Sequence, residues 1–141
     1  MKAYEIPVST GVLKMIKRDY GYSKHMRIDR MIIGKAQGDP LDWKKYIENT
    51  LESQVRITLV CKYVSEGKLY TIAKLLENEF KTKMLLYLEG AVDNGMDLCE
   101  GIRKFMDKYD LTDEDLEMET ARKRWYRYKK KEFNKNMIPL W

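Results

Sequence analysis

The feature that most constrains the fold is a long apolar repeat in the middle of the chain. From Leu69 to Val92, apolar residues recur at steps of three and four. This spacing matches the period of an α-helix with one apolar face. It predicts an amphipathic helix over about 66–92, ended by the turn sequence Asp93-Asn94-Gly95. Such a helix is expected to be the spine of the fold.

The residues before this helix contain strand signals. Residues 3–9 and 54–63 alternate apolar side chains on one face, which predicts two strands that pair either within one chain or across a dimer. Pro7 places the first strand at a sheet edge, because proline cannot donate to a ladder. Residues 26–34 are a third strand candidate, with a short helix as the rival interpretation.

Two short helices are predicted between these strands. The first covers 11–20 and is stopped by Gly21. The second covers 41–51 and follows Pro40, which a helix tolerates in its first turn. The residues of the second helix that we expect to be available to the core are Leu41, Trp43, Ile47 and Leu51.

The C-terminal part has the skeleton of a helix-turn-helix. A helix capped by Asp97 is predicted to run to about Tyr109, and a tight link then leads into a final helix over Thr112–Lys135. Asp110 occupies the position of the link that favours a left-handed residue. The apolar contacts of the motif are expected from Phe105, Tyr109, Leu111 and Leu116.

These elements predict an α+β protein that is mostly α. We divide it into an N-terminal strand and helix subdomain, residues 1–64, and a helical part, residues 65–141. The chain of 141 residues is 44% hydrophobic, so it has enough apolar side chains to form a core that needs no disulfide or metal for stability. Cys61 and Cys99 have apolar neighbours and no CxxC spacing, so we interpret them as reduced core residues.

Charge is sorted along the predicted final helix, acidic first and basic afterwards. Residues 121–136 contain eight Lys or Arg and one Glu, a net charge of +7, whereas the whole chain is only +5. The rest of the chain therefore sums to −2, and the basic character is a local patch. A local basic patch favours a nucleic acid or another anionic partner.

The acidic start of this helix restricts how it could meet DNA. A standard recognition helix presents its N-terminal residues to the bases, and Asp113, Glu114 and Asp115 would repel phosphate there. We therefore predict phosphate contact through the C-terminal half, and we expect Trp125 to belong to the core. The predicted nucleic-acid-binding residues are Arg122, Lys123, Arg124, Tyr126, Arg127, Tyr128, Lys130 and Lys131.

Other interpretations of the basic half remain open. It could be an ordinary solvated helix end, or an interface for an acidic protein or for the acidic half of a second copy. The apolar tail Pro139-Leu140-Trp141 either folds back on its own core or docks into a neighbouring subunit. The alternative function is thus a structural or assembly protein that forms a homo-oligomer.

We find no catalytic constellation in the sequence. The single histidine, His25, has no cysteine or carboxylate at ligand spacing, and no glycine-rich phosphate loop occurs. We predict a protein that is not an enzyme and uses no metal or other cofactor. No membrane span or signal peptide is expected, which favours the cytoplasm.

The chain from about Gly95 to Lys131 resembles small uncharacterised proteins of tailed bacteriophages and bacterial mobile elements. Residues 102–106, 108–116 and 124–130 carry the resemblance, which covers about a quarter of the chain. Asp110 stands where that family usually has the glycine of the turn. The resemblance implies a host-cell or virion location, a possible phage protein as partner, and one of two roles. These are a DNA-binding regulator or packaging accessory, and a small structural or assembly protein.

Overall fold

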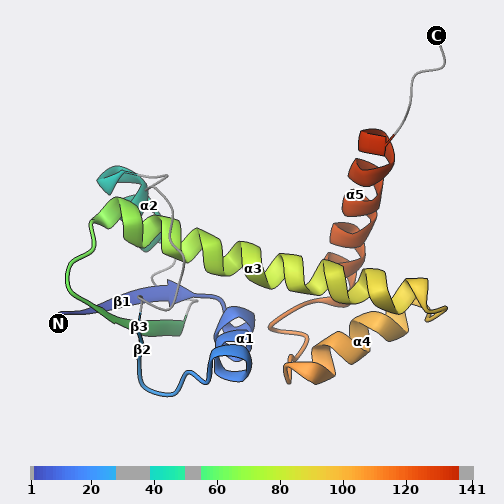
Figure 1. The fold of residues 1–141 in the computed structure, drawn as a ribbon, viewed down its shortest axis with the longest axis horizontal. Coiled ribbons are helices and arrows are strands. Elements are labelled where there is room, and N and C mark those ends of the chain that lie inside the picture. Colours follow the sequence, from blue (N-terminus) through green and yellow to red (C-terminus); the bar gives the residue numbers. More distant parts are fainter. Residues whose placement is uncertain (1, 28–38, 50–54, 137–141) are drawn as a thin grey trace, which may run out of the picture. The chain divides into compact units, whose positions relative to one another are not determined.

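The structure, a computed structural model, describes residues 2–27, 39–49 and 55–136. Over these residues it has five helices and three strands, so the α+β, mostly helical class is confirmed (Figure 1). The chain forms two compact units, residues 1–80 and 81–141. We predicted a division between residues 64 and 65, where the long helix begins; the units divide further along, inside that helix.

Unit 1 contains a three-stranded sheet in the order β1-β3-β2. The strands are β1 (Lys2–Val8), β2 (Met26–Arg27) and β3 (Val55–Cys61). β1 and β3 are antiparallel, with Tyr4 opposite Leu59, so the two predicted strands pair within one chain. Pro7 lies on an edge strand as predicted. β2 pairs parallel to β3, and the remainder of the predicted strand over 26–34 lies outside the described residues.

The first helix, α1 (Thr10–Tyr20), confirms the prediction from its flanking residues. The Ser9 hydroxyl accepts a hydrogen bond from the Val12 N–H, and Gly21 ends the helix at φ 64°, in the left-handed region. A Cβ on Gly11 would lie 3.0 Å from the Phe80 ring. Gly11 therefore lets α1 approach the long helix closely.

The second helix, α2 (Pro40–Asn49), begins with a reciprocal cap. The Asp39 carboxylate accepts from the Asp42 N–H at 2.9 Å, and the Asp42 carboxylate accepts from the Asp39 N–H at 3.0 Å. The prediction that Leu41 faces the core is wrong, because its side chain is 57% exposed.

Tyr46 explains this orientation of α2. Its hydroxyl donates to the Pro7 carbonyl, and its ring contacts Trp43 and Tyr70. Tyr46 is about 140° around the helix from Leu41, so anchoring through Tyr46 turns Leu41 outward. Trp43 and Ile47 are half-buried, and Leu51 lies outside the described residues.

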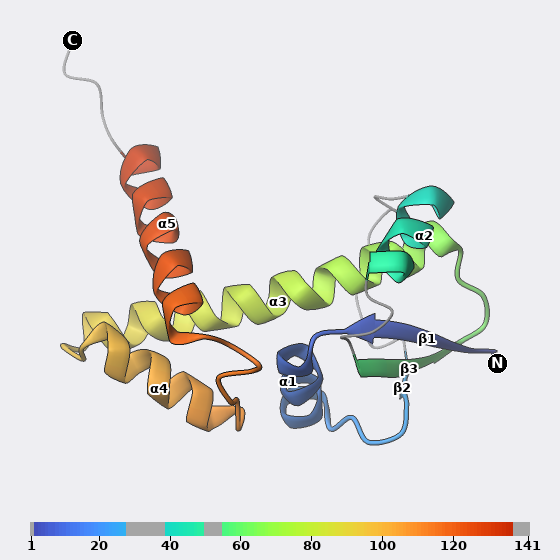
Figure 2. The same ribbon diagram turned by 180° about the vertical axis from the view of Figure 1, so that it is seen from behind.

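The predicted spine is α3 (Glu66–Asp93). Figures 1 and 2 show the sheet and α1 along the same side of its first half. The core of unit 1 joins the inward sheet face, α1 and this half of α3. Its fully buried residues include Ile6, Val8, Val12, Met15, Ile16, Ile57, Leu59, Ile72, Ala73 and Leu76. Cys61 is buried as predicted, whereas Cys99 in unit 2 is only half-buried, and both are free thiols.

Unit 2 is built on the end of α3. After a turn with Gly95 at φ 86°, α4 (Leu98–Lys108) begins with the Asp97 carboxylate accepting from the Cys99 N–H. α4 folds back along α3, and a Cβ on Gly101 would lie 3.3 Å from Leu88, so a larger residue would separate the helices. Ile102, Phe105 and Met106 of α4 are buried, whereas Leu98 is half-buried.

The final helix, α5 (Met118–Asn136), starts later than predicted. Asp110 is left-handed at φ 54°, as expected. The predicted helix start at Thr112 is wrong, however, because the Thr112 N–H bonds to the Asp115 carboxylate and closes a single isolated turn. Leu116 then enters the core, which takes the chain off a helical path. The connection is therefore the whole segment 109–117, longer than a helix-turn-helix turn.

Candidate nucleic-acid interface

The inner face of α5, formed by Ala121, Trp125 and Tyr128, packs against the rest of unit 2. Ala121 is fully buried and Trp125 is only 5% exposed, which confirms Trp125 as a core residue. The rings of Trp125 and Tyr128 lie 5.9 Å apart. Leu116, just before α5, is also buried, so the first half of the helix has a continuous apolar base.

Tyr128 belongs to this inner face. Its hydroxyl donates to Glu89 Oε2 on α3 at 2.6 Å. The hydrogen bond to Glu89, followed by one to Glu132 and by burial, raises the pKa of Tyr128. That Tyr128 contacts nucleic acid stays a prediction; in the structure its hydroxyl is bonded to Glu89 of α3, which is too distant in sequence to be predicted as its partner.

The opposite side of α5 carries a stripe of cations, which we call the outer face. Lys123, Arg127 and Lys130 are spaced i, i+4, i+7, so they follow one line along the helix, and all three are exposed. Lys131 is exposed next to this line. Beyond Trp125, none of the described side chains of α5 is buried.

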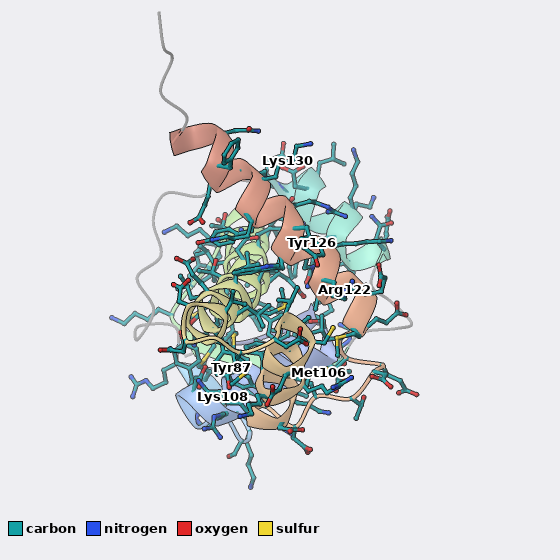
Figure 3. The ribbon with its side chains drawn as sticks, turned by 90° about the vertical axis from the view of Figure 1, so that its right-hand side faces the viewer. Tyr87, Met106, Lys108, Arg122, Tyr126 and Lys130 are labelled. Atoms are coloured by element: carbon teal, nitrogen blue, oxygen red, sulfur yellow. The ribbon has the colours of Figure 1, made fainter. Side chains whose placement is uncertain are left out.

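Other predicted residues lie on the flanks of the outer face. Figure 3 shows Arg122, Tyr126 and Lys130 following one another along α5. A hydrogen bond with Tyr126, and then the charge of Glu119, raise the pKa of the Arg122 guanidinium. Arg124 is half-buried and interacts within the chain, so its guanidinium is less accessible to a partner than the cations of the outer face are.

Lys129, which is next to Lys130 in sequence, is directed differently. Its ammonium lies 3.2 Å from a Glu132 carboxylate oxygen and 5.3 Å from the centre of the Trp125 ring. This lysine is therefore held toward the inner face. Adjacent lysines thus have two distinct environments, one paired and one on the exposed stripe.

The late start of α5 changes the position of the acidic residues. Asp113, Glu114 and Glu117 are exposed in the connecting segment, outside the helix. Only Glu119 remains as an acidic residue in the first turn of α5. The carboxylates that would have faced DNA at the start of a recognition helix are therefore displaced from it.

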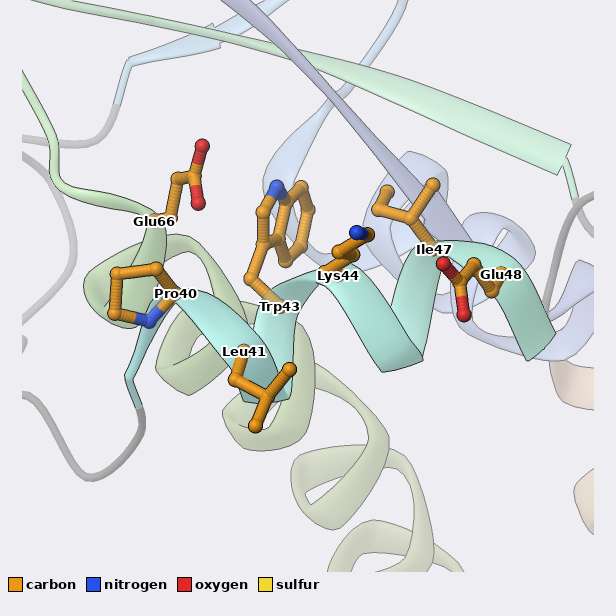
Figure 4. Close-up of a pocket in the computed structure, with 7 residues that line it drawn as sticks. All are labelled: Pro40, Leu41, Trp43, Lys44, Ile47, Glu48 and Glu66. Carbon is orange, nitrogen blue, oxygen red and sulfur yellow. The ribbon is translucent and has the colours of Figure 1, made fainter.

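A second surface feature lies in unit 1 and was not predicted. A groove of about 600 Å³ runs beside α2, with Trp43 and Ile47 on its apolar side (Figure 4). Lys44, Glu48 and Glu66 add charge of both signs. The exposed Leu41 borders this groove with Pro40.

Two further properties concern only the described part of the chain. Over residues 2–27, 39–49 and 55–136, no three His, Cys, Asp or Glu side chains are grouped as metal ligands. In the same ranges, none of the helices combines the length and apolar character needed to cross a membrane.

Comparisons with known proteins gave no match, whether with family models, curated proteins or solved structures. The resemblance to proteins of phages and mobile elements stays a prediction. The function is therefore inferred from the residues of the chain itself.

Proposed function

We propose that this chain is a non-enzymatic DNA-binding protein of a phage or mobile element, a regulator or packaging accessory. It contacts the phosphate backbone through the outer face of α5 and acts as a homo-oligomer. The observation that supports this proposal is the stripe Lys123, Arg127 and Lys130, which is exposed along the outer face of α5. The stripe continues past Trp125 into a part of the helix in which none of the described side chains is buried.

The spacing of this stripe suits a polyanion. Seven residues of α-helix span about 10 Å, and each strand of duplex DNA carries one charge per about 3.4 Å of the axis. Three cations on one line can therefore each approach a phosphate of the same backbone. Every phosphate neutralised releases counterions, which makes binding favourable at low salt and weak at high salt.

The test is binding of a 20-base-pair duplex of random sequence, followed by fluorescence anisotropy. We expect the variant with Lys123, Arg127 and Lys130 changed to Gln to bind at least about tenfold more weakly than wild type at low salt. A matched control changes the exposed Lys24, Lys45 and Lys62 of unit 1 to Gln, which removes the same charge. Equal losses in both variants, or no loss in the first, would contradict the assignment to α5.

The second candidate is an assembly protein that self-associates through α5. The exposed acids Asp113, Glu114 and Glu117 favour it, because they are complementary in charge to the outer face of another copy. The prediction for this role is a mass by light scattering that falls as salt rises, and falls again when the chain is truncated after Asn136. A monomer in every condition would exclude self-association.

A further inference from the structure

Two aromatic side chains of α5 project into solvent. Tyr126 is 56% exposed and Phe133 is 67% exposed. They differ from the other aromatic residues that the structure describes in unit 2, which pack against one another: Phe105 lies 5.6 Å from Tyr87 and 5.2 Å from Tyr109, and Trp125 lies 5.9 Å from Tyr128, ring centre to ring centre. Ring packing within unit 2 therefore does not account for Phe133 or for the ring of Tyr126, although Tyr126 also makes a hydrogen bond with Arg122.

These two rings form a line with a lysine of the outer face. Tyr126, Lys130 and Phe133 are spaced i, i+4, i+7, so they share one side of the helix, with the exposed Lys130 between the rings. Lys130 also belongs to the stripe of Lys123 and Arg127. A row of aromatic rings thus runs beside a row of cations, and the two rows meet at Lys130.

This pairing fits single-stranded nucleic acid better than a duplex. Aromatic side chains stack on the faces of unpaired bases, while neighbouring cations hold the backbone. In a duplex the faces of the bases are covered by their neighbours, so an exposed ring finds a stacking partner only at an end or an unpaired site. The rings are about 10 Å apart along α5, about three times the 3.4 Å rise of stacked bases.

We infer that α5 binds single-stranded DNA in preference to duplex DNA, with Tyr126 and Phe133 stacking on two bases and Lys123, Arg127 and Lys130 along the phosphates. This inference rests on the proposed DNA-binding function and specifies its substrate. An unpaired region of DNA, such as a junction or a single-stranded end, is then the target.

The test compares one 20-nucleotide strand of mixed sequence with the duplex of the same sequence. Changing Tyr126 and Phe133 to Ala should weaken binding to the single strand at least about 30-fold and binding to the duplex less than about threefold. The matched control changes Tyr63 and Leu86 to Ala, because both are also large exposed apolar residues. The exchange of Tyr126 to Phe together with Phe133 to Tyr keeps two rings and should restore single-strand affinity.

The outcomes separate this inference from the proposed function. If the double alanine variant loses the same factor on both probes, or loses nothing, base stacking is excluded while duplex binding still supports the DNA-binding role. If wild type binds the duplex more tightly than the single strand, the preference is wrong. If wild type binds neither probe at low salt, both the inference and the proposed function fail.

Discussion

The two halves of α5 differ in whether their side chains include buried ones that pack against the rest of unit 2. The first half, up to Trp125, buries Ala121 and Trp125 and is held against the rest of unit 2. The second half carries Lys130, Lys131 and Phe133 in exposed positions. One continuous helix therefore combines an inner face that packs, with its buried side chains in the first half, and an outer face of exposed cations that runs along both halves.

This difference leads to an experimental separation. Substitutions on the inner face should change the free energy of unfolding, and substitutions on the outer face should change binding. A variant that changes both quantities strongly would show that the two faces are not independent. The following predictions test this separation, beginning with the largest effect.

Changing Trp125 to Ala should give the largest loss of stability, about 3–5 kcal/mol in the free energy of unfolding. The side chain is 5% exposed, so its removal leaves a cavity under α5. Urea unfolding followed by circular dichroism measures this loss. The control, Phe133 to Ala, removes an exposed ring from the same helix and should change stability by less than about 0.5 kcal/mol. Similar losses in both variants would contradict the division of the helix.

Changing Tyr128 to Phe should cost about 1 kcal/mol, because it removes the hydrogen bond to the Glu89 carboxylate and leaves the ring in place. DNA affinity should not change, since this hydroxyl faces α3. The comparison variant changes Tyr126, on the exposed side of the helix, to Phe. Its effect on the free energy of unfolding should be smaller. A loss of DNA affinity in the Tyr128 variant would show that the Tyr128 hydroxyl contributes to DNA binding.

Stability should fall as the pH rises above about 10. Burial, and then the charge of Glu77, raise the pKa of Tyr46 to about 12, and hydrogen bonding raises the pKa of Tyr128. Below the usual tyrosine pKa of about 10 both hydroxyls are neutral in both states, and their stabilisation is complete. Above it the unfolded chain releases protons first, so stability is lost as the pH approaches the folded value.

Urea midpoints measured from pH 9 to 11.5 test this slope. Replacing Tyr46 with Phe should make the decline shallower in unit 1, and replacing Tyr128 with Phe should do so in unit 2. Slopes identical to wild type in both variants would show that neither hydroxyl is coupled to folding.

The smallest predicted effects come from adjacent lysines. Changing Lys129 to Gln removes its contacts with Glu132 and the Trp125 ring, and should cost about 0.5 kcal/mol of stability while affinity changes little. Changing Lys130 to Gln should leave stability unchanged and weaken DNA binding. If the affinity loss is the same for both, net charge rather than the outer face controls binding.

Local signals allowed much of this fold to be predicted. Gly21 and Asp97 act at helix ends as expected, and Asp110 adopts the left-handed conformation that its place in the link requires. The alternation of β1 and β3 and the period of α3 also correspond to the structure. In each case the residues that determine the helix end, strand or helix lie within it or a few residues from it in the sequence.

The errors arose where distant contacts decide. The burial of Leu116 takes the chain off a helical path, so α5 begins at Met118 although Thr112 and Asp115 form a good cap. The bond of Tyr46 to β1 turns Leu41 outward. At the candidate site, the outer cations were predicted from spacing, and the role of Tyr128 in nucleic-acid binding stays a prediction. The bond of its hydroxyl to Glu89 could not be predicted, because Glu89 lies in another helix.

The salt dependence of DNA binding tests the central claim most directly. The logarithm of the association constant would be measured against the logarithm of salt concentration for wild type and for the variant with Lys123, Arg127 and Lys130 changed to Gln. If each cation neutralises one phosphate of a duplex, the magnitude of the slope should fall by about 2.7, or about 0.9 for each contact. Equal slopes for the two proteins would contradict phosphate contact through the outer face of α5.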